Sequence, residues 1–113
     1  MAADAIFAKK GTDIVLLDVE AVFLLSDIFV IATGTSRPHV QALADHVEEK
    51  LKEGAGVKPL RVEGRSEAEW VLIDYGDIIV HLFQEPAREY YSLERLWGDS
   101  ERVRWEEPAV TDR

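Results

Sequence analysis

The stretch from residue 28 to residue 51 constrains the fold of this 113-residue chain more than any other segment. Residues 28–32 (IFVIA) are an apolar run of β-branched and aromatic side chains, which is typical of a strand buried on both faces. The turn TGTS at 33–36 breaks this strand, and Ser36 can cap a helix that tolerates Pro38 in its first turn. The segment therefore predicts a strand, a turn and a helix packed on a sheet. The apolar stripe of that helix consists of Val40, Leu43, Ala44, Val47 and Leu51.

Four more strands are predicted around this unit, because short apolar runs alternate with turn-forming residues. Only Gly76 and Asp77 separate the last two, which indicates a tight hairpin of antiparallel neighbours. A closing helix is expected over 85–97. We therefore predict one α/β domain over residues 1–113, with a mixed sheet of about five strands packed by helices and a tail that frays from about residue 98. The four strands are expected at 13–18, 57–62, 70–75 and 78–83.

Composition excludes several classes of protein. The chain has no cysteine, so it can hold neither a disulfide nor a thiolate metal site. No apolar run reaches the ~18 to 20 residues that a membrane helix needs. In the N-terminal MAADAIFAKK the lysines follow the apolar patch, which is the reverse of the order in a secretion signal. We expect a short or frayed helix there, no membrane partner and a cytoplasmic protein.

The charge balance bears on the partner. The formal net charge is −9, from 22 acidic and 13 basic residues. Proteins that bind nucleic acid use Lys and Arg to displace counterions from phosphate, so direct contact with RNA or DNA is not expected. A basic protein partner fits this balance. Charge that only keeps the chain in solution is the other interpretation.

Three patterns that could support catalysis or metal binding lack residues that such chemistry needs. The TGTS turn could hold a phosphate on backbone amides, but it has no P-loop pattern and no lysine follows it; a capped helix start is the other interpretation. No pair of aspartates spaced for Mg²⁺ lies on a following strand. His39 and His46 lie two helical turns apart, ~11 Å, and nothing in the sequence brings His81 to them. We predict no catalytic residue, no metal and no cofactor, with a metal-dependent nucleotidyltransferase or nucleotide-binding enzyme as the alternative.

The predicted hairpin has the composition of an interface. Trp70 and Asp74 alternate with buried-type residues, so one face carries an aromatic ring and an acid. Tyr75, Asp77 and His81 would extend polar and aromatic surface around the turn. A tryptophan in a small domain is also a common core residue, and both roles stay open for Trp70.

Three long segments together resemble one known family. They are EGRSEAEWVLIDYGDIIVHLF at 63–83, REYYSLERLW at 88–97 and DIFVIATGTSRPHVQALADHVEEKL at 27–51. Their ordered pattern resembles the ribosomal silencing factor family, also called Iojap-related, in a bacterial member. The likeness runs from about Asp13 to Trp97, and the segment before Asp13 is short for the family.

The resemblance implies a nucleotidyltransferase-like fold without the catalytic carboxylates. It also implies a translational repressor that binds the large ribosomal subunit through ribosomal protein L-fourteen and sterically blocks joining of the small subunit. A homodimer is possible, and a dimeric adaptor for another basic partner is a second alternative. By the same resemblance, Leu93, Leu96 and Trp97 would anchor the last helix to the sheet. The candidate docking residues are Trp70, Asp74, Tyr75, Gly76, Asp77 and His81.

Overall fold

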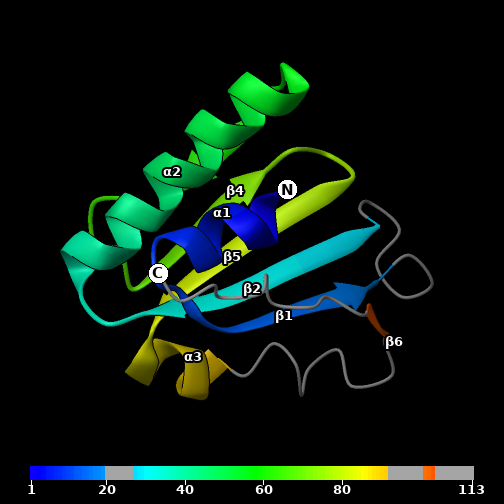
Figure 1. Cartoon of the computed structure of the whole chain (residues 1–113). Coiled ribbons are helices and arrows are strands. Elements are labelled where there is room, and N and C mark those ends of the chain that lie inside the picture. Colours follow the sequence, from blue (N-terminus) through cyan, green and yellow to red (C-terminus); the bar gives the residue numbers. More distant parts are fainter. Residues whose placement is uncertain (20–26, 92–100, 104–113) are drawn as a thin grey trace, which may run out of the picture.

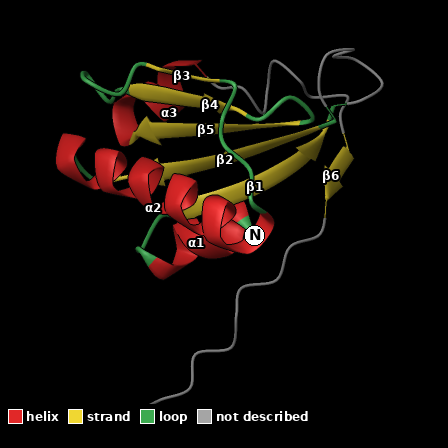
Figure 2. Ribbon diagram, turned by 90° about the horizontal axis from the view of Figure 1, so that it is seen from above, coloured by secondary structure: helices red, strands yellow, loops and turns green. Residues whose placement is uncertain are grey.

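The computed structural model describes residues 1–19, 27–91 and 101–103, which form one mixed sheet with helices on both faces (Figures 1 and 2). Helices α1 and α2 lie on one face of the sheet, and α3 lies on the other. The helices are α1 (Ala2–Ala8), α2 (Arg37–Ala55) and α3 (Glu85–Tyr91). The strands are β1 (Thr12–Asp18), β2 (Ile28–Gly34), β3 (Arg61–Glu63), β4 (Trp70–Asp74), β5 (Ile78–Gln84) and β6 (Glu101–Val103).

The strand order in the sheet is β3-β4-β5-β2-β1-β6. Strands β2 and β5 pair in parallel, whereas the other neighbouring strands pair antiparallel. The predicted hairpin is β4–β5, with Asp74 opposite Ile79 and Trp70 opposite Phe83. The predicted mixed sheet of about five strands is therefore confirmed. A sixth strand, β6, comes from the tail that we expected to fray, and it pairs with β1.

The strand-turn-helix unit forms as predicted. The Ser36 side chain caps α2 by accepting a hydrogen bond from the backbone N–H of His39 at 3.2 Å, and Pro38 lies in the first turn. At Gly34 the strand passes so close to the helix that an added Cβ would lie 2.8 Å from Cγ2 of Val40. Any larger residue at this position would force the Val40 side chain to shift. All five residues of the predicted apolar stripe are buried.

The core has two parts, one on each face of the sheet. The larger part lies between the sheet and helices α1 and α2, and includes Val71 and Ile73 of β4. The smaller part lies on the opposite face and includes Ala87 of α3, with Trp70 and Leu72 packed at its border. The side chains of β4 thus alternate between the two parts of the core, as the sequence predicted.

Three predicted elements differ in extent. The strand expected at 57–62 is shorter and forms only at Arg61–Glu63. Before it, Val57 and Leu60 are exposed, and Pro59 has no N–H to donate. The N-terminal helix packs firmly, since Ile6 is completely buried. The closing helix runs to Tyr91 in the described part. The anchor residues predicted at Leu93, Leu96 and Trp97 lie outside the described residues.

Candidate docking surface

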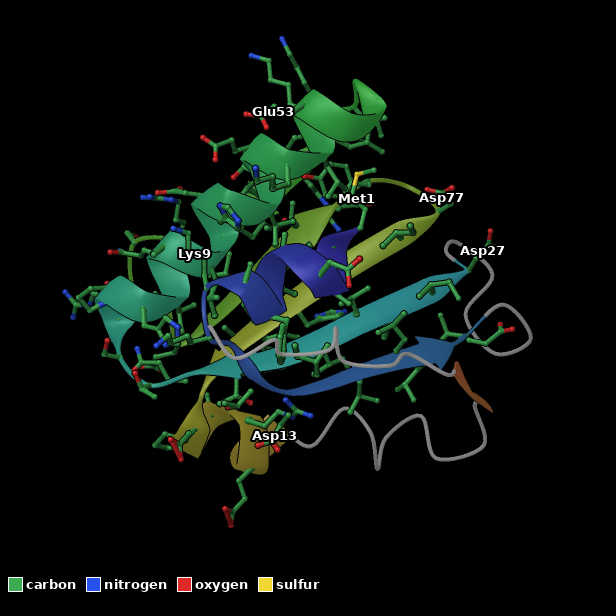
Figure 3. All side chains as sticks on the ribbon, in the orientation of Figure 1. Met1, Lys9, Asp13, Asp27, Glu53 and Asp77 are labelled. Carbon is green, nitrogen blue, oxygen red and sulfur yellow. The ribbon has the colours of Figure 1, made fainter. Side chains whose placement is uncertain are left out.

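At the hairpin end of the sheet, each of four neighbouring strands has an aspartate at or next to its end. Asp18 ends β1 and pairs with Ile28, and Asp27 directly precedes β2. Asp74 ends β4, and Asp77 directly precedes β5. The backbone N–H groups of Asp27 and Ile28 donate to the carbonyl oxygen of Asp77 at 2.8 and 3.1 Å. Asp27 and Asp77 therefore lie side by side at this end of the molecule (Figure 3).

Asp74 and Asp77 differ in what their carboxylates do. In Asp74, Oδ1 accepts a hydrogen bond from the backbone N–H of Gly76 at 2.8 Å, and Oδ2 accepts one from Nε of Arg61 at 3.2 Å. The Asp74 side chain is only 17% exposed. The carboxylate of Asp77 is exposed and has no side-chain partner among the described residues. Asp74 thus shapes the turn, whereas the carboxylate of Asp77 is exposed to solvent.

The turn itself depends on Gly76. Its φ of 94° lies in a region that side chains rarely adopt. The backbone N–H of Tyr75 donates to the carbonyl oxygen of Ile78 at 2.9 Å and closes the turn. The ring of Tyr75 packs against the core beneath α2, and its buried hydroxyl has no partner among the described residues. Burial, with a smaller contribution from Glu48, raises the pKa of Tyr75 to about 12.

Trp70 and His81 form a hydrogen-bonded pair across β4 and β5. The indole N–H of Trp70 donates to Nδ1 of His81 at 3.0 Å, and the Trp70 ring stacks on Phe83 with centroids 5.2 Å apart. His81 is 4% exposed and packs edge-on against Phe29. Burial lowers the pKa of His81 to about 4, so the ring is neutral at pH 7 and Nδ1 can accept the bond.

This geometry corrects part of the prediction for the hairpin. His81 does not extend the polar surface, because its ring is buried beneath Trp70 and between aromatic neighbours. Trp70 borders the smaller part of the core and is half-buried, and its role as an interface anchor stays a prediction. Sequence reasoning missed Asp27, whose only signal was its place directly before a buried strand. The parallel pairing of β2 with β5 brings Asp27 beside Asp77.

The phosphate interpretation of the TGTS turn meets a specific obstacle. The backbone N–H of Thr35 donates to Nδ1 of His39 at 2.9 Å, and the N–H of His39 donates to Ser36. The Nε2 atom of His39 lies 2.8 Å from the carbonyl oxygen of Lys9, which accepts its proton. Two amides that a phosphate would need are therefore already used within the protein.

Within residues 1–19, 27–91 and 101–103, no three His, Asp or Glu side chains are grouped so as to hold a metal ion. No helix in this part of the chain is long and apolar enough to cross a bilayer.

Comparison with known proteins decides the family. The family model described as ribosomal silencing factor during starvation matches residues 1–113. The chain belongs to the ribosomal silencing factor family. A ribosomal silencing factor from Halalkalibacterium halodurans is 42% identical over 106 residues, which cover 94% of this chain and 90% of the relative. A crystal structure of a protein from Chromobacterium violaceum is 39% identical, with a TM-score of 0.82 over 99% of this chain and 88% of that one.

The ribosomal silencing factor family also has relatives in organelles. A mouse protein named mitochondrial assembly of ribosomal large subunit protein 1 is 30% identical over 91 residues, which cover 79% of this chain and 40% of that protein. The predicted resemblance is thus confirmed, and the chain is a ribosomal silencing factor with a role connected to translation. This family is not a known family of enzymes.

Proposed function

We propose that this ribosomal silencing factor represses translation in the cytoplasm by binding the large ribosomal subunit through ribosomal protein L-fourteen and blocking the small subunit from joining. The name of the mouse relative connects the family with the large subunit. The observation that carries the proposal is the exposed carboxylate of Asp77 beside Asp27 at the hairpin end of the sheet. Carboxylates in this arrangement suit Lys and Arg side chains of a basic protein.

Charge and size both support this mode of action. The net charge of −9 favours a basic protein and disfavours a stretch of ribosomal RNA as the contact. The radius of gyration is 13.3 Å, near the ~13 Å of a compact domain of about 100 residues. A body of that size covers a contact between subunits by bulk alone, so no catalysis is needed.

The six predicted docking residues divide into two groups in this proposal. Asp77 and the backbone at Gly76 meet the partner. The side chains of Trp70, Asp74, Tyr75 and His81 support this surface from within the domain, because they are engaged or buried there.

Reversing the charge of Asp77 tests the proposal. The Asp77→Lys variant should bind purified large subunits about 10- to 100-fold more weakly, since one charge-assisted hydrogen bond is worth about 1.5–3 kcal/mol and the new lysine repels basic groups. Co-sedimentation with large subunits measures the binding. Light scattering on adding small subunits measures joining, which this variant should no longer inhibit at concentrations where the natural chain does.

Glu67→Lys is the matched control. Glu67 is exposed and precedes β4 at the end opposite the hairpin, so the variant makes the same charge change away from the proposed surface. It should bind and inhibit as the natural chain does. Equal weakening by both variants would mean that only net charge matters, and an unaffected Asp77→Lys variant would remove the hairpin end from the proposal.

The enzymatic alternative gains no support from the described residues. Two backbone amides of the TGTS turn and helix start already donate hydrogen bonds within the protein, so they do not point to a phosphate. At the hairpin end, the carboxylate of Asp74 is already paired with Arg61. No observation favours the adaptor with another partner over the ribosomal reading.

A further inference from the structure

Two large apolar side chains are exposed in the loop that precedes β3. Leu60 is 73% exposed and Val57 is 40% exposed. Among the described residues, Met1 is the only other exposed large apolar side chain. A single exposed leucine on a protein surface needs no special explanation. Leu60 differs from such a residue because it lies next to the hairpin turn.

Leu60 lies directly over the hairpin turn. Its backbone N–H donates to the carbonyl oxygen of Asp74 at 2.7 Å. A Cβ added at Gly76 would lie 3.5 Å from Cδ1 of Leu60, so the leucine side chain lies beside the glycine that directly precedes Asp77. The apolar side chain and the available carboxylate therefore belong to one continuous surface.

The backbone around Leu60 is held in place before any partner binds. Pro59 fixes one φ angle next to it, and Arg61 begins the paired strand β3. The Arg61 guanidinium bridges Glu63 at 2.7 Å and Asp74 at 3.2 Å, which ties the loop to β4. Because this backbone is already fixed, burying Leu60 in an interface costs little additional backbone entropy.

We propose that Leu60, assisted by Val57, is an apolar anchor that enters a hollow in a basic protein of the large ribosomal subunit next to the residues that meet Asp77. This inference rests on the proposed function and names a determinant within that surface. The occupant follows from charge complementarity. Asp77 directly follows the glycine beside the anchor, and Asp27 lies next to Asp77. These two carboxylates repel phosphate and attract Lys and Arg, so the surface fits a basic protein and not RNA.

Substitution at Leu60 separates the anchor from the charges. Leu60→Ser should weaken binding to purified large subunits about tenfold or more, because burial of a leucine side chain contributes at least a factor of about ten to affinity. The loss should appear mainly as faster dissociation. Leu60→Met keeps the apolar volume and should bind within about threefold of the natural chain. Both variants should melt within about 3 °C of it, since the residue is exposed.

Salt dependence distinguishes this inference from the proposed function. The loss of affinity caused by Asp77→Lys should become smaller as the salt concentration rises, because salt screens charges. The affinity of Leu60→Ser should change with salt as the affinity of the natural chain does. Weak binding by Asp77→Lys with unchanged binding by Leu60→Ser overturns the anchor and leaves the proposed function standing. A natural chain that does not bind large subunits overturns both.

Crosslinking can identify which molecule of the large subunit contacts this surface. The chain has no cysteine, so Val57→Cys introduces a single thiol for a photoactivated crosslinker. Irradiation on purified large subunits should join the chain to one basic ribosomal protein. Crosslinks to ribosomal RNA overturn the inference. A Leu60→Ser variant that loses self-association in sedimentation and keeps full binding to large subunits assigns the leucine to a second copy of the chain and also overturns it.

Discussion

Aspartates and histidines of this domain have roles that depend on their surroundings. Asp74 and Asp77 are three residues apart, yet one carboxylate is engaged by Gly76 and Arg61 and the other is exposed. His39 lies at the helix start and bridges Thr35 to Lys9 through its two ring nitrogens. His81 is instead enclosed by aromatic rings and accepts one hydrogen bond from Trp70. The surrounding atoms, and not the residue type, assign each role.

Buried His81 makes folding stability depend on pH. Its pKa is about 4 in the folded chain and about 6.5 in an unfolded one, so the unfolded chain takes up the proton first as pH falls. Stability is therefore unaffected by His81 above about pH 6.5 and declines below it. Between pH 7 and pH 4 the free energy of unfolding should fall by about 3 kcal/mol from this residue. Urea denaturation at several pH values measures the decline.

Two variants isolate the contribution of His81. His81→Gln keeps an acceptor for the Trp70 indole but does not titrate, so its stability should fall by about 3 kcal/mol less than that of the natural chain over the same range. Trp70→Phe keeps the histidine and should lose stability at every pH while keeping the steep dependence. Parallel pH curves for the natural chain and His81→Gln would contradict this account.

At the scale of elements, the hairpin β4–β5 and the loop before β3 form one structural unit. The turn at Gly76 is closed by its own backbone, supported by Asp74 and flanked by Leu60. The exposed groups that we assign to the partner are thus presented by strands, whose positions the sheet fixes. A site built on strands is more precise than one on a free loop.

The conformation of Gly76 predicts a measurable cost of substitution. Gly76→Ala should lower the free energy of unfolding by about 1–2 kcal/mol, because φ at this position is 94° and a Cβ is strained there. Gly54→Ala is the comparison. Gly54 lies within α2 without a positive φ, and an added Cβ would meet only the flexible end of Met1. That variant should be neutral or slightly stabilised. Equal costs in chemical denaturation would contradict a special role of the turn.

At the scale of the whole molecule, the described sheet ends at two short edge strands, β3 and β6. Each has three residues. Strand β3 carries Arg61 and Glu63, whose side chains are 57% and 56% exposed. Short, charged edges resist pairing with another chain. Any self-association through these edges is therefore expected to be weak.

The sheet has two edges that could pair with a second chain, and because they are short we predict a reversible homodimer only at high concentration. Sedimentation velocity should detect dimer near ~0.1 mM, a concentration that corresponds to weak affinity, and mostly monomer at a few micromolar. Arg61→Glu places like charges along β3, so dimers formed through that edge should dissociate in this variant. A chain that remains monomeric at ~0.1 mM would exclude the dimer.

Strands and helices that depend on neighbouring residues were predictable from the amino-acid sequence. Alternating or continuous apolar runs placed the strands, and the cap at Ser36 with a helical stripe placed α2, because backbone preference and burial of one face act over neighbouring residues. The family was also predictable from the sequence, since the resemblance rested on long ordered segments and the family model matches the whole chain. The sequence predicted the hairpin as the candidate surface, which the proposed function retains.

The accessibility of each hairpin residue became clear from the folded sheet and not from the sequence. The sheet order brings Asp27 beside Asp77 and places Leu60 over the turn, although these residues are far apart in the chain. Packing against Phe29 and Phe83 buries His81, which the alternation along one strand could not reveal. The reason is physical: exposure depends on what packs against a side chain from other strands, and that is a property of the assembled fold and not of the local sequence.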